Sequence, residues 1–381
     1  MLAGAGDAMA RLPQHDQRRD RGAAAGRGAG PGSRARMGIA LAGAAGILGL
    51  LAVLWWLVAT QQPARAVRID LSSPWNPAEF HVANARDFAE AVAAATEGRV
   101  RIIVHPAAEL GIKGPDSLTA VAQGAVPMID MAGFQQTGLE PLFGLEALPF
   151  LVRNREELRL LYSFLRPEIE KRLRHWGLVL VYLVPWPPQN IFLDRPVHRV
   201  EELRGLRVRT LDAHTTRLAE ALGMHPRQLP AADVVPALAA GALDAVMTST
   251  TTAAAQHYPA FLHEMLPTHH GWVVNYVVVR KDVLARLLPA DRMRMLRIAQ
   301  ARERRYWAVS AADDAAKWRE LAAAGMERLP VSAELRAAFE RIARPLWQAY
   351  VAQVPEARPI LNRFLERTGR MPLGGAGEEA P

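Results

Sequence analysis

One structural unit recurs along the chain and constrains its fold more than any other feature. In each copy, an amphipathic helical pattern ends at a glycine, and a short apolar stretch typical of a buried strand follows. The helical patterns lie at residues 84–96, 116–123, 156–176 and 232–240, and the strands at residues 100–104, 126–131, 178–184 and 243–248. Strands that are apolar throughout need cover on both faces, so this alternation predicts an α/β fold with parallel or mixed sheets. Asn84 is the expected N-cap of the first of these helices.

A long helix is the second organising feature. Between Pro289 and Gly325 the chain contains neither proline nor glycine, and its pattern is helical throughout. A single helix over this stretch would be about 52 Å long at ~1.5 Å per residue, which exceeds one small domain. We therefore expect it to lie along two lobes. Two shorter helices that meet near residues 308–315 are the alternative.

The N-terminal region predicts a membrane-directed segment. Residues 38–59 carry no charge and include two adjacent tryptophans, and Arg34 and Arg36 stand just before them. A buried core helix seldom has so long an apolar run. We interpret residues 37–60 as a signal or membrane-anchor segment, and residues 1–36 as a disordered basic arm rich in Ala, Gly and Arg.

Two fates of this segment fit the sequence. The small-x-small pattern at residues 64–66 offers a cleavage site, whereas the length of the apolar run fits an uncleaved anchor better. In both cases the positive-inside rule places the chain beyond Val67 outside the cytoplasm. The expected location is the periplasm, with export through, or anchoring in, the inner membrane by residues 38–60.

Charge and composition exclude several classes of protein. The net charge is +8, and residues 1–36 hold seven Arg against three Asp, so the basic arm carries half of that charge. The other basic residues are scattered without an aromatic cluster, which argues against nucleic acid as a partner. The chain has no cysteine and therefore no disulfide or thiol chemistry.

The inventory of catalytic motifs is poor. The body lacks a zinc-binding HExxH helix, a P-loop, a GxSxG nucleophile elbow and a nicotinamide fingerprint, so we expect no enzyme activity, no cofactor and no metal. His269 and His270 are adjacent and predict a loop or a solvated edge rather than a ligand pair. Asp212 and His214 lie in an expected loop without a nucleophile tied to them.

A rigid loop after the strand at residues 178–184 is the first candidate for ligand binding. Three prolines in the sequence Pro-Trp-Pro-Pro-Gln-Asn fix its backbone and hold Trp186, Gln189 and Asn190 beyond the sheet. A hydrophobic corner capped by the tryptophan is the alternative.

Two further segments carry polar side chains where strands end. Arg207 and Arg209 alternate with apolar residues on a short strand, where a buried guanidinium calls for an anion. Thr248 and Ser249 begin a run of hydroxyl residues after the strand at residues 243–248. These hydroxyls could cap the next helix, donate hydrogen bonds to a ligand, or do both.

Five motifs in order give the chain a family resemblance. They are Gly-Pro-Asp at residues 114–116, Leu-Pro-Phe at 148–150, Arg-Pro-Val at 195–197 with Glu-Glu-Leu-Arg-Gly-Leu-Arg-Val-Arg at 201–209, Leu-Gly-Met-His-Pro at 222–226, and Leu-Asp-Ala-Val-Met-Thr-Ser at 243–249. In order and spacing they resemble the solute-binding proteins of TRAP transporters, the DctP family. The similarity extends from about Ile69 to about Val354.

The resemblance implies a two-lobed α/β fold like that of periplasmic binding proteins, with mixed sheets, a hinge and a long helix that spans both lobes. Lobe I would hold residues 67–187 with about 275–300, and lobe II residues 188–274 with about 301–354. The polar, Gly- and Pro-containing composition beyond Pro355 independently predicts that residues 355–381 form a disordered C-terminal tail. The implied function is extracytoplasmic capture of a small organic acid and its delivery to the small and large membrane subunits of the transporter.

The resemblance also assigns roles in the cleft. Arg209 matches the arginine that binds the substrate carboxylate in this family, and Asn275 matches a further cleft position. Gln189 stands where many relatives have a second arginine, and Thr248 stands where many have an asparagine. With Trp186 adding apolar area, these differences favour a monocarboxylate with a less polar body over a C4-dicarboxylate.

Other interpretations stay open at this point. Arg209 could instead form an internal salt bridge with Asp212 or Asp233. The chain could also be a membrane-anchored extracytoplasmic α/β hydrolase, or a solute receptor of an ABC importer or a sensor.

Overall fold

The computed structural model describes residues 49–55 and 66–374, apart from the side chain of Ala232. The expected basic arm, most of the apolar segment 37–60 and the end of the chain from residue 375 lie outside the described residues. Residues 49–55 are helical, and none of the helices described is both long and apolar enough to cross a membrane. The chain divides between Ala64 and Arg65 into two units, and every strand described belongs to the second unit.

Lobe I is built on a five-stranded mixed sheet with the order β2-β1-β3-β10-β4. Its strands are β1 (Val67–Ser72), β2 (Val100–His105), β3 (Met128–Ala132), β4 (Leu178–Pro185) and β10 (Val274–Arg280). Strands β1, β2 and β3 are parallel, whereas β10 runs antiparallel to both β3 and β4. Strand β10 follows β9 of the second sheet in the sequence. The first sheet is therefore completed by a segment far from β1, β2 and β3 in the chain.

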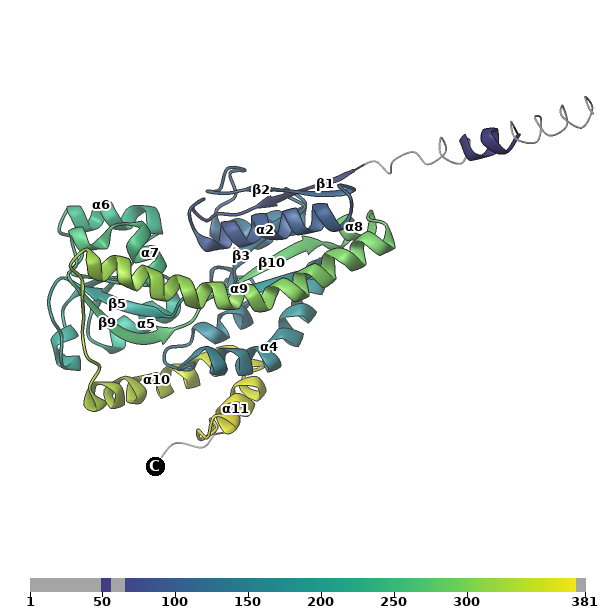
Figure 1. Cartoon of the computed structure of the whole chain (residues 1–381). Coiled ribbons are helices and arrows are strands. Elements are labelled where there is room, and N and C mark those ends of the chain that lie inside the picture. Colours follow the sequence, from purple (N-terminus) through teal and green to yellow (C-terminus); the bar gives the residue numbers. More distant parts are fainter. Residues whose placement is uncertain (1–48, 56–65, 375–381) are drawn as a thin grey trace, which may run out of the picture. The chain divides into compact units, whose positions relative to one another are not determined.

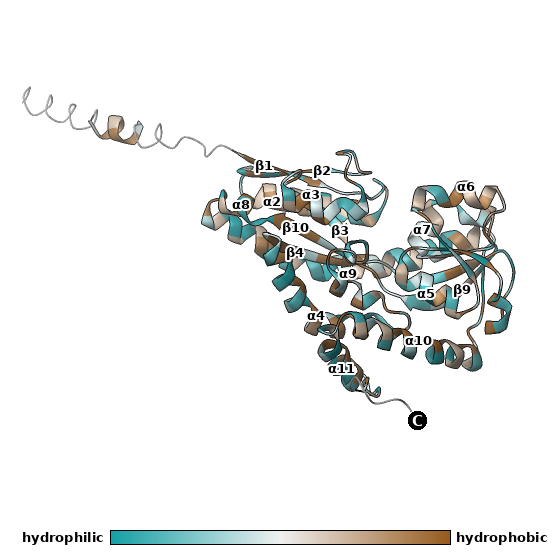
Figure 2. Ribbon diagram, turned by 180° about the vertical axis from the view of Figure 1, so that it is seen from behind, coloured by the Kyte–Doolittle hydropathy of each residue, from teal (hydrophilic) through white to brown (hydrophobic). Residues whose placement is uncertain are grey.

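Helices cover both faces of this sheet (Figure 1). One face packs on α2 (Phe80–Ala95), α8 (Lys281–Ala285) and the first half of α9 (Pro289–Ala323), and the other on α3 (Ser117–Gln123), α4 (Arg155–His175) and the 3-10 segment η3 (Pro141–Ala147). Figure 2 shows hydrophobic residues along β1 and β10 between these layers. Each fully buried aliphatic side chain in such a core stabilises the fold by about 1.5 to 3 kcal/mol.

Lobe II is built on a six-stranded mixed sheet with the order β11-β9-β5-β8-β6-β7. Its strands are β5 (Gln189–Leu193), β6 (Arg207–Thr210), β7 (His225–Gln228), β8 (Ala245–Thr248), β9 (Glu264–Gly271) and β11 (Glu327–Arg328). One face packs on α5 (Ala213–Ala221) and α10 (Ala333–Gln353), and the other on α6 (Val234–Ala239), α7 (Thr250–Ala255) and the end of α9. The side chains of β5 alternate between these two cores, as the strand period requires.

The recurring helix–glycine–strand unit is confirmed. Gly98, Gly124, Gly177 and Gly241 follow α2, α3, α4 and α6 with φ values between +63° and +86°, the left-handed conformation that ends a helix. The expected cap of α2 was wrong. This helix begins at Phe80, and Asn84 is buried inside it rather than at its start.

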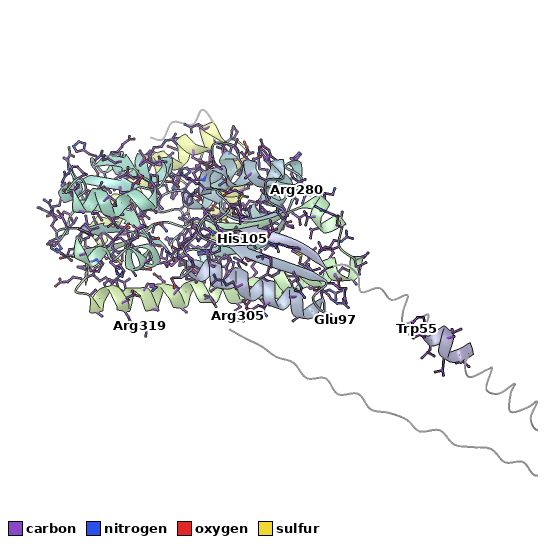
Figure 3. All side chains as sticks on the ribbon, turned by 90° about the horizontal axis from the view of Figure 1, so that it is seen from above. Trp55, Glu97, His105, Arg280, Arg305 and Arg319 are labelled. Atoms are coloured by element: carbon purple, nitrogen blue, oxygen red, sulfur yellow. The ribbon has the colours of Figure 1, made fainter. Side chains whose placement is uncertain are left out.

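The predicted long helix is a single element, α9, with 35 residues, so the α/β fold with two mixed sheets and a long helix is confirmed. It contacts α2 and β4 of lobe I and α7 of lobe II. Arg305 and Arg319 lie on its exposed side (Figure 3).

Ion pairs and hydrogen bonds fix α9 along both lobes. Asp87 of α2 accepts hydrogen bonds from Arg302 at 2.7 Å and from Tyr306 at 2.9 Å. In lobe II, Thr250 and Thr251 at the start of α7 donate to Asp314 at 2.6 Å and to Asp313 at 2.5 Å.

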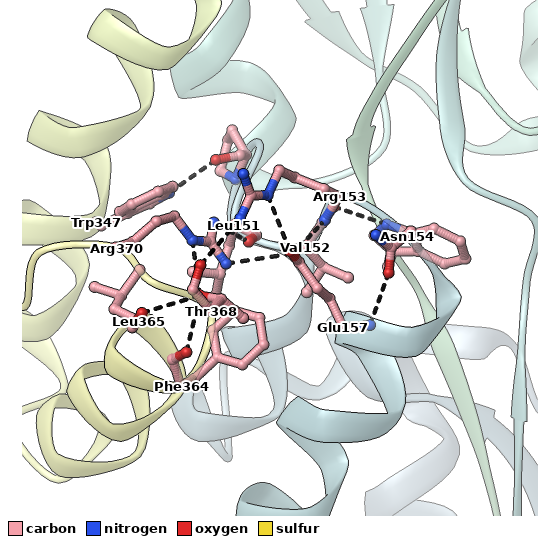
Figure 4. Close-up of polar contacts among 12 residues, drawn as sticks. Leu151, Val152, Arg153, Asn154, Glu157, Trp347, Phe364, Leu365, Thr368 and Arg370 are labelled. Atoms are coloured by element: carbon pink, nitrogen blue, oxygen red, sulfur yellow. Dashed lines mark hydrogen bonds and ion pairs between the residues drawn. The ribbon is translucent and has the colours of Figure 1, made fainter.

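The expected disordered tail was wrong for the residues described. Helix α11 (Ala357–Arg367) buries Leu361 and Phe364 against α4, because its apolar residues recur with helical spacing. Arg370 then donates to the Leu151 carbonyl at 2.6 Å and pairs with Glu157 at 3.3 Å (Figure 4). The polar composition beyond Pro355 concealed this short amphipathic helix.

Glu146 is an ionisable group inside the core of lobe I. Its side chain is fully buried in η3, and neither carboxyl oxygen has a hydrogen bond of good geometry among the residues described, so weaker interactions with Tyr162 and the Val274 backbone only partly offset its burial. Burial raises the pKa of Glu146 to about 8, so the carboxyl is largely protonated at neutral pH. A buried acid of this kind destabilises the fold as it ionises.

We predict that Glu146→Gln stabilises the protein by an amount that grows as the pH rises from about 4.5 to about 8. The folded state holds the Glu146 proton more tightly than the unfolded state does, so the stability of the wild type falls as pH rises from about 4.5 to about 8. The variant lacks this loss. Chemical denaturation should show a free energy of unfolding higher by roughly 3 to 5 kcal/mol near pH 8, with a much smaller difference near pH 5.

Glu140→Gln is the matched control, because Glu140 accepts hydrogen bonds from Arg172 and Trp176 and should lose stability when neutralised. A stability gain for Glu146→Gln that does not depend on pH would contradict the argument.

Candidate functional site

Two adjacent crossover segments join the sheets and bring their polar edges together. One links β4 to β5, and the other links β9 to β10. The Trp186 amide donates to the Val273 carbonyl at 2.8 Å, and Gln189 pairs with Gly271. The end of β4 and the beginnings of β5 and β10 therefore meet beside the hinge. The end of β6 lies near them, because β6 and β5 both pair with β8.

Arg209 lies at the end of β6 on the lobe II side. Its side chain is 5% exposed, and the guanidinium donates to the carbonyls of Leu229 at 3.0 Å and Met247 at 3.2 Å. Neither Asp212 nor Asp233 forms an ion pair with it, and no other carboxylate among the described residues does so. Burial lowers the pKa of Arg209, so this cation has lost its water without gaining an anion.

Arg207 plays a different part, although it shares the same strand. It is exposed and forms a bidentate ion pair with Asp244, with contacts of 2.8 and 2.5 Å. The two arginines that alternate with apolar residues on this strand therefore differ. Arg209 is buried without an acidic partner among the residues described, whereas Arg207 is exposed and paired.

The other predicted residues of lobe II differ in their partners. Asn190 and Thr248 pair across β5 and β8 at the same edge as Arg209, and both are buried. Gln189 donates to the Pro187 carbonyl at 3.2 Å, and its own carbonyl oxygen has no partner. Ser249 is the N-cap of α7, since its hydroxyl accepts from the Thr252 amide at 3.3 Å.

On the lobe I side, Trp186 and Asn275 form a buried hydrogen-bond chain. The Trp186 indole donates to Asn275 at 2.8 Å, and Asn275 donates to Asp130 at 2.8 Å. Burial raises the pKa of Asp130 to about 7, although interactions with the Trp75 indole and with Asn275 oppose this. Asp130 is a site residue that the sequence analysis missed, because a single acid inside an apolar strand carries no motif.

Trp186 also belongs to an aromatic cluster with three side chains that the sequence analysis did not select. His81 stacks on it at 4.1 Å between ring centroids, and Trp75 and Phe80 meet it edge-on at 5.1 and 5.9 Å. Burial lowers the pKa of His81 to about 3, so the imidazole is neutral. The predicted hydrophobic corner is therefore present, and it shares its tryptophan with the polar chain to Asp130.

Some buried polar atoms lack a hydrogen-bond partner among the residues described. They include the hydroxyls of Ser72 and Ser73 at the end of β1 and the side-chain oxygen of Gln189, whereas the Trp75 indole interacts with Asp130 and His81 interacts with the backbone of Val184. Buried polar groups are nearly always hydrogen-bonded, so the free oxygen of Gln189 at the crossover is a candidate ligand contact. Leu211, which follows Arg209 by two residues, packs against the cluster containing Trp186.

The arrangement can bind an anion and enclose an uncharged body. Arg209 offers one cation, whereas the polar groups across from it are neutral or carry a proton for part of the time near neutral pH. Among residues 49–55 and 66–374, no group of three or more His, Asp or Glu side chains could hold a metal ion. His270 is buried in β9, which corrects the expected loop or solvated edge.

Comparison with known sequences gives a match over most of the chain. The sequence model of the family described as bacterial extracellular solute-binding protein, family 7, matches residues 71–353. A solute-binding protein of Chromohalobacter salexigens is 23% identical over 72% of this chain and 82% of its own length. A protein of Haemophilus influenzae is 26% identical over 54% of this chain, which spans 63% of that relative's length.

Solved structures show the same fold. DctP7 of Bordetella pertussis, an extracytoplasmic solute receptor binding pyroglutamic acid, superposes with a TM-score of 0.74 and 27% identity over 78% of this chain and 99% of its own. DctP6 of the same organism, which also binds pyroglutamic acid, gives 0.75 and 25% identity over 79% of this chain and 100% of its own.

The Trp186–Asn275–Asp130 chain predicts a pH-dependent loss of stability. Asn275→Ala leaves the Trp186 indole without a partner and removes one of the hydrogen bonds of Asp130, and it should cost about 1 to 3 kcal/mol. It also raises the pKa of Asp130 above about 7, and since the folded state then holds that proton more tightly, the loss should be greater at pH 8 than at pH 5, with the increase arising above about pH 7.

Denaturant unfolding at both pH values measures this effect. Asn84→Ala is the control, because the Asn84 amide nitrogen is buried without a partner and its removal leaves no other group unpaired. An equal loss for Asn275→Ala at both pH values would count against a role of the Asp130 proton.

Proposed function

The chain belongs to the bacterial extracellular solute-binding proteins of family 7, so it captures a small organic acid outside the cytoplasm for a TRAP transporter, and we propose that this acid is a compact monocarboxylate of the pyroglutamate type. The observation that carries the proposal is the buried guanidinium of Arg209, which has no acidic partner among the described residues. A planar guanidinium matches a carboxylate with two parallel hydrogen bonds.

The charge of the cleft favours one carboxylate over two. Arg209 is the buried cation at this edge, Gln189 is neutral, and Asp130 would repel a second carboxylate whenever it is ionised. The aromatic rings of Trp186 and Trp75 suit a flat and weakly polar ring. DctP7 and DctP6, at 27% and 25% identity, bind pyroglutamic acid, a cyclic amide with one carboxylate.

We assign the individual contacts as follows. Arg209 binds the carboxylate, with Thr248 on the adjoining strand β8 and Asn190 on β5, the next strand along. The unpaired carbonyl of Gln189 accepts the ring N–H, and Trp186, held by Asn275, packs on the ring. Ser249 contributes by fixing the start of α7 rather than by direct contact.

The N-terminal segment has a proposed role in export. Residues 49–55 form a helix whose apolar side chains are all exposed, with Trp55 at 74%. Together with the flanking apolar residues this favours a leader or an anchor in the inner membrane, and it leaves the body free to deliver its ligand to the membrane subunits.

Substitution of Arg209 tests the proposal directly. Arg209→Lys keeps the charge but loses the bidentate geometry, and Arg209→Ala loses both. The affinity for pyroglutamate should fall for Ala by roughly 2 to 5 kcal/mol, which is about 30- to 5,000-fold. Arg207→Lys is the matched control on the same strand, and it should leave affinity unchanged because Arg207 pairs with Asp244.

Isothermal calorimetry with pyroglutamate, succinate and glucuronate provides the measurement. Wild-type affinity in a folded Arg209→Ala protein would refute the role of Arg209. Tighter binding of succinate than of pyroglutamate would refute the monocarboxylate assignment.

The crossovers at residues 186–188 and 272–273 lead to a prediction about motion. We expect the two lobes to close on the ligand by rotation about these segments. Small-angle scattering should then show a smaller radius of gyration with saturating pyroglutamate. Arg209→Ala at the same ligand concentration should stay extended, and an unchanged radius for the saturated wild type would contradict closure.

A further inference from the structure

A separate groove of about 500 Å³ lies on the hinge strand β9 and shares no lining residue with the proposed cleft. Its walls come from the segment after η3, from the bulged part of β9, from the residues after β11 and from the first half of α10. None of the assigned functions uses it.

The walls of the groove are predominantly basic. Arg153, Arg328 and Arg336 line it, with Glu340 as the acid among its lining residues. Arg153 pairs with Glu157 at 2.9 Å, as Figure 4 shows. Arg328 and Arg336 form no ion pair among the described residues, although Arg328 lies over the Trp318 ring.

The floor of the groove is apolar. Phe150 and Phe339 stack there with ring centroids 4.9 Å apart, and Leu329 and Val331 extend this surface. An apolar floor beneath two unpaired guanidinium groups suits a molecule that has an anionic head and an aromatic or aliphatic body.

Two strained residues line the same groove. Phe150 and His269 have φ values of +56° and +48°, a conformation that side chains other than glycine rarely adopt. Around His269, the pairing of β5 with β9 shifts register between Gln189 and Ile191. Each such residue costs about 1 to 3 kcal/mol and persists where the surroundings hold it, typically at ligand sites and switches.

The strain lies next to the cleft. The His269 amide donates to the side chain of Asn190 at 3.4 Å, and the Phe150 amide donates to the His270 carbonyl at 2.9 Å. Burial lowers the pKa of His269, and the charges of Arg328 and Arg336 lower it further against the opposing charge of Asp314, so the neutral imidazole is favoured. It can therefore donate a hydrogen bond without adding charge.

We propose that this groove is a second binding site, for an amphipathic organic anion. The ligand is a carboxylate or phosphate monoester with an apolar body. Arg328 and Arg336 bind its head, and the stacked Phe150 and Phe339 bind its body.

Phenyl phosphate is the probe, titrated by calorimetry into the full chain at low ionic strength. We expect saturable binding that Arg328→Ser/Arg336→Ser weakens at least about tenfold. Arg341→Ser is the control, because Arg341 is exposed on the same helix and does not line the groove. Inorganic phosphate, which lacks the apolar body, should bind at least about tenfold more weakly.

The Arg209→Ala protein distinguishes binding in the groove from binding in the cleft. This variant should still bind phenyl phosphate, although it no longer binds pyroglutamate. Loss of phenyl phosphate binding in Arg209→Ala, with normal binding in the double variant, would overturn the proposal and leave the cleft as the site. Absence of saturable binding to the wild type at about 10 mM probe would also overturn it.

Discussion

Two sheets with separate cores can share one binding cleft only if something holds them in register while leaving the space between them accessible. Helix α9 supplies this constraint, because its 35 residues cross both lobes and it bonds to each of them. Near its middle, Glu303 accepts from the Leu183 amide of β4 at 3.1 Å and from Arg166 at 2.6 Å. The helix is thereby tied to the strand that leads directly into the crossover at Trp186.

The electrostatics of the proposed cleft depend on two buried groups of residues. On the lobe II side, Arg209 is a desolvated cation with no carboxylate partner among the residues described. On the lobe I side, burial keeps His81 neutral and raises the pKa of Asp130 to about 7, so Asp130 holds its proton for part of the time near neutral pH. If Arg209 formed an internal ion pair, its charge would already be balanced by a carboxylate of the protein. An anionic ligand would then have to break that pair in order to bind.

The hinge combines irregular backbone with proline restraint. Pro187 and Pro188 lie in the crossover from β4 to β5, the pairing of β5 with β9 shifts register, and Phe150 and His269 next to them adopt left-handed backbones. Cores that are close-packed move as units, so a rotation of the lobes has to be absorbed in such segments. The proposed cleft and the basic groove both border these hinge segments, and the two sites share no lining residue.

Most helices and strands of this protein can be predicted from the sequence, because helical period, glycine caps and apolar strands are local properties. The sequence predicts the helical stretch between Pro289 and Gly325, although one helix and two shorter ones fit it, together with a short strand that carries Arg209 and a proline-fixed loop around Trp186. Which side chains meet depends on tertiary packing: Asn275 reaches Asp130 across 145 residues, and His81 from α2 stacks on Trp186. Tertiary packing also decided that Arg207 has an acid and Arg209 has none, that Ser249 caps a helix, and that α11 docks on α4. Such pairings depend on the packing of layers from distant segments, and no periodicity within one segment records them.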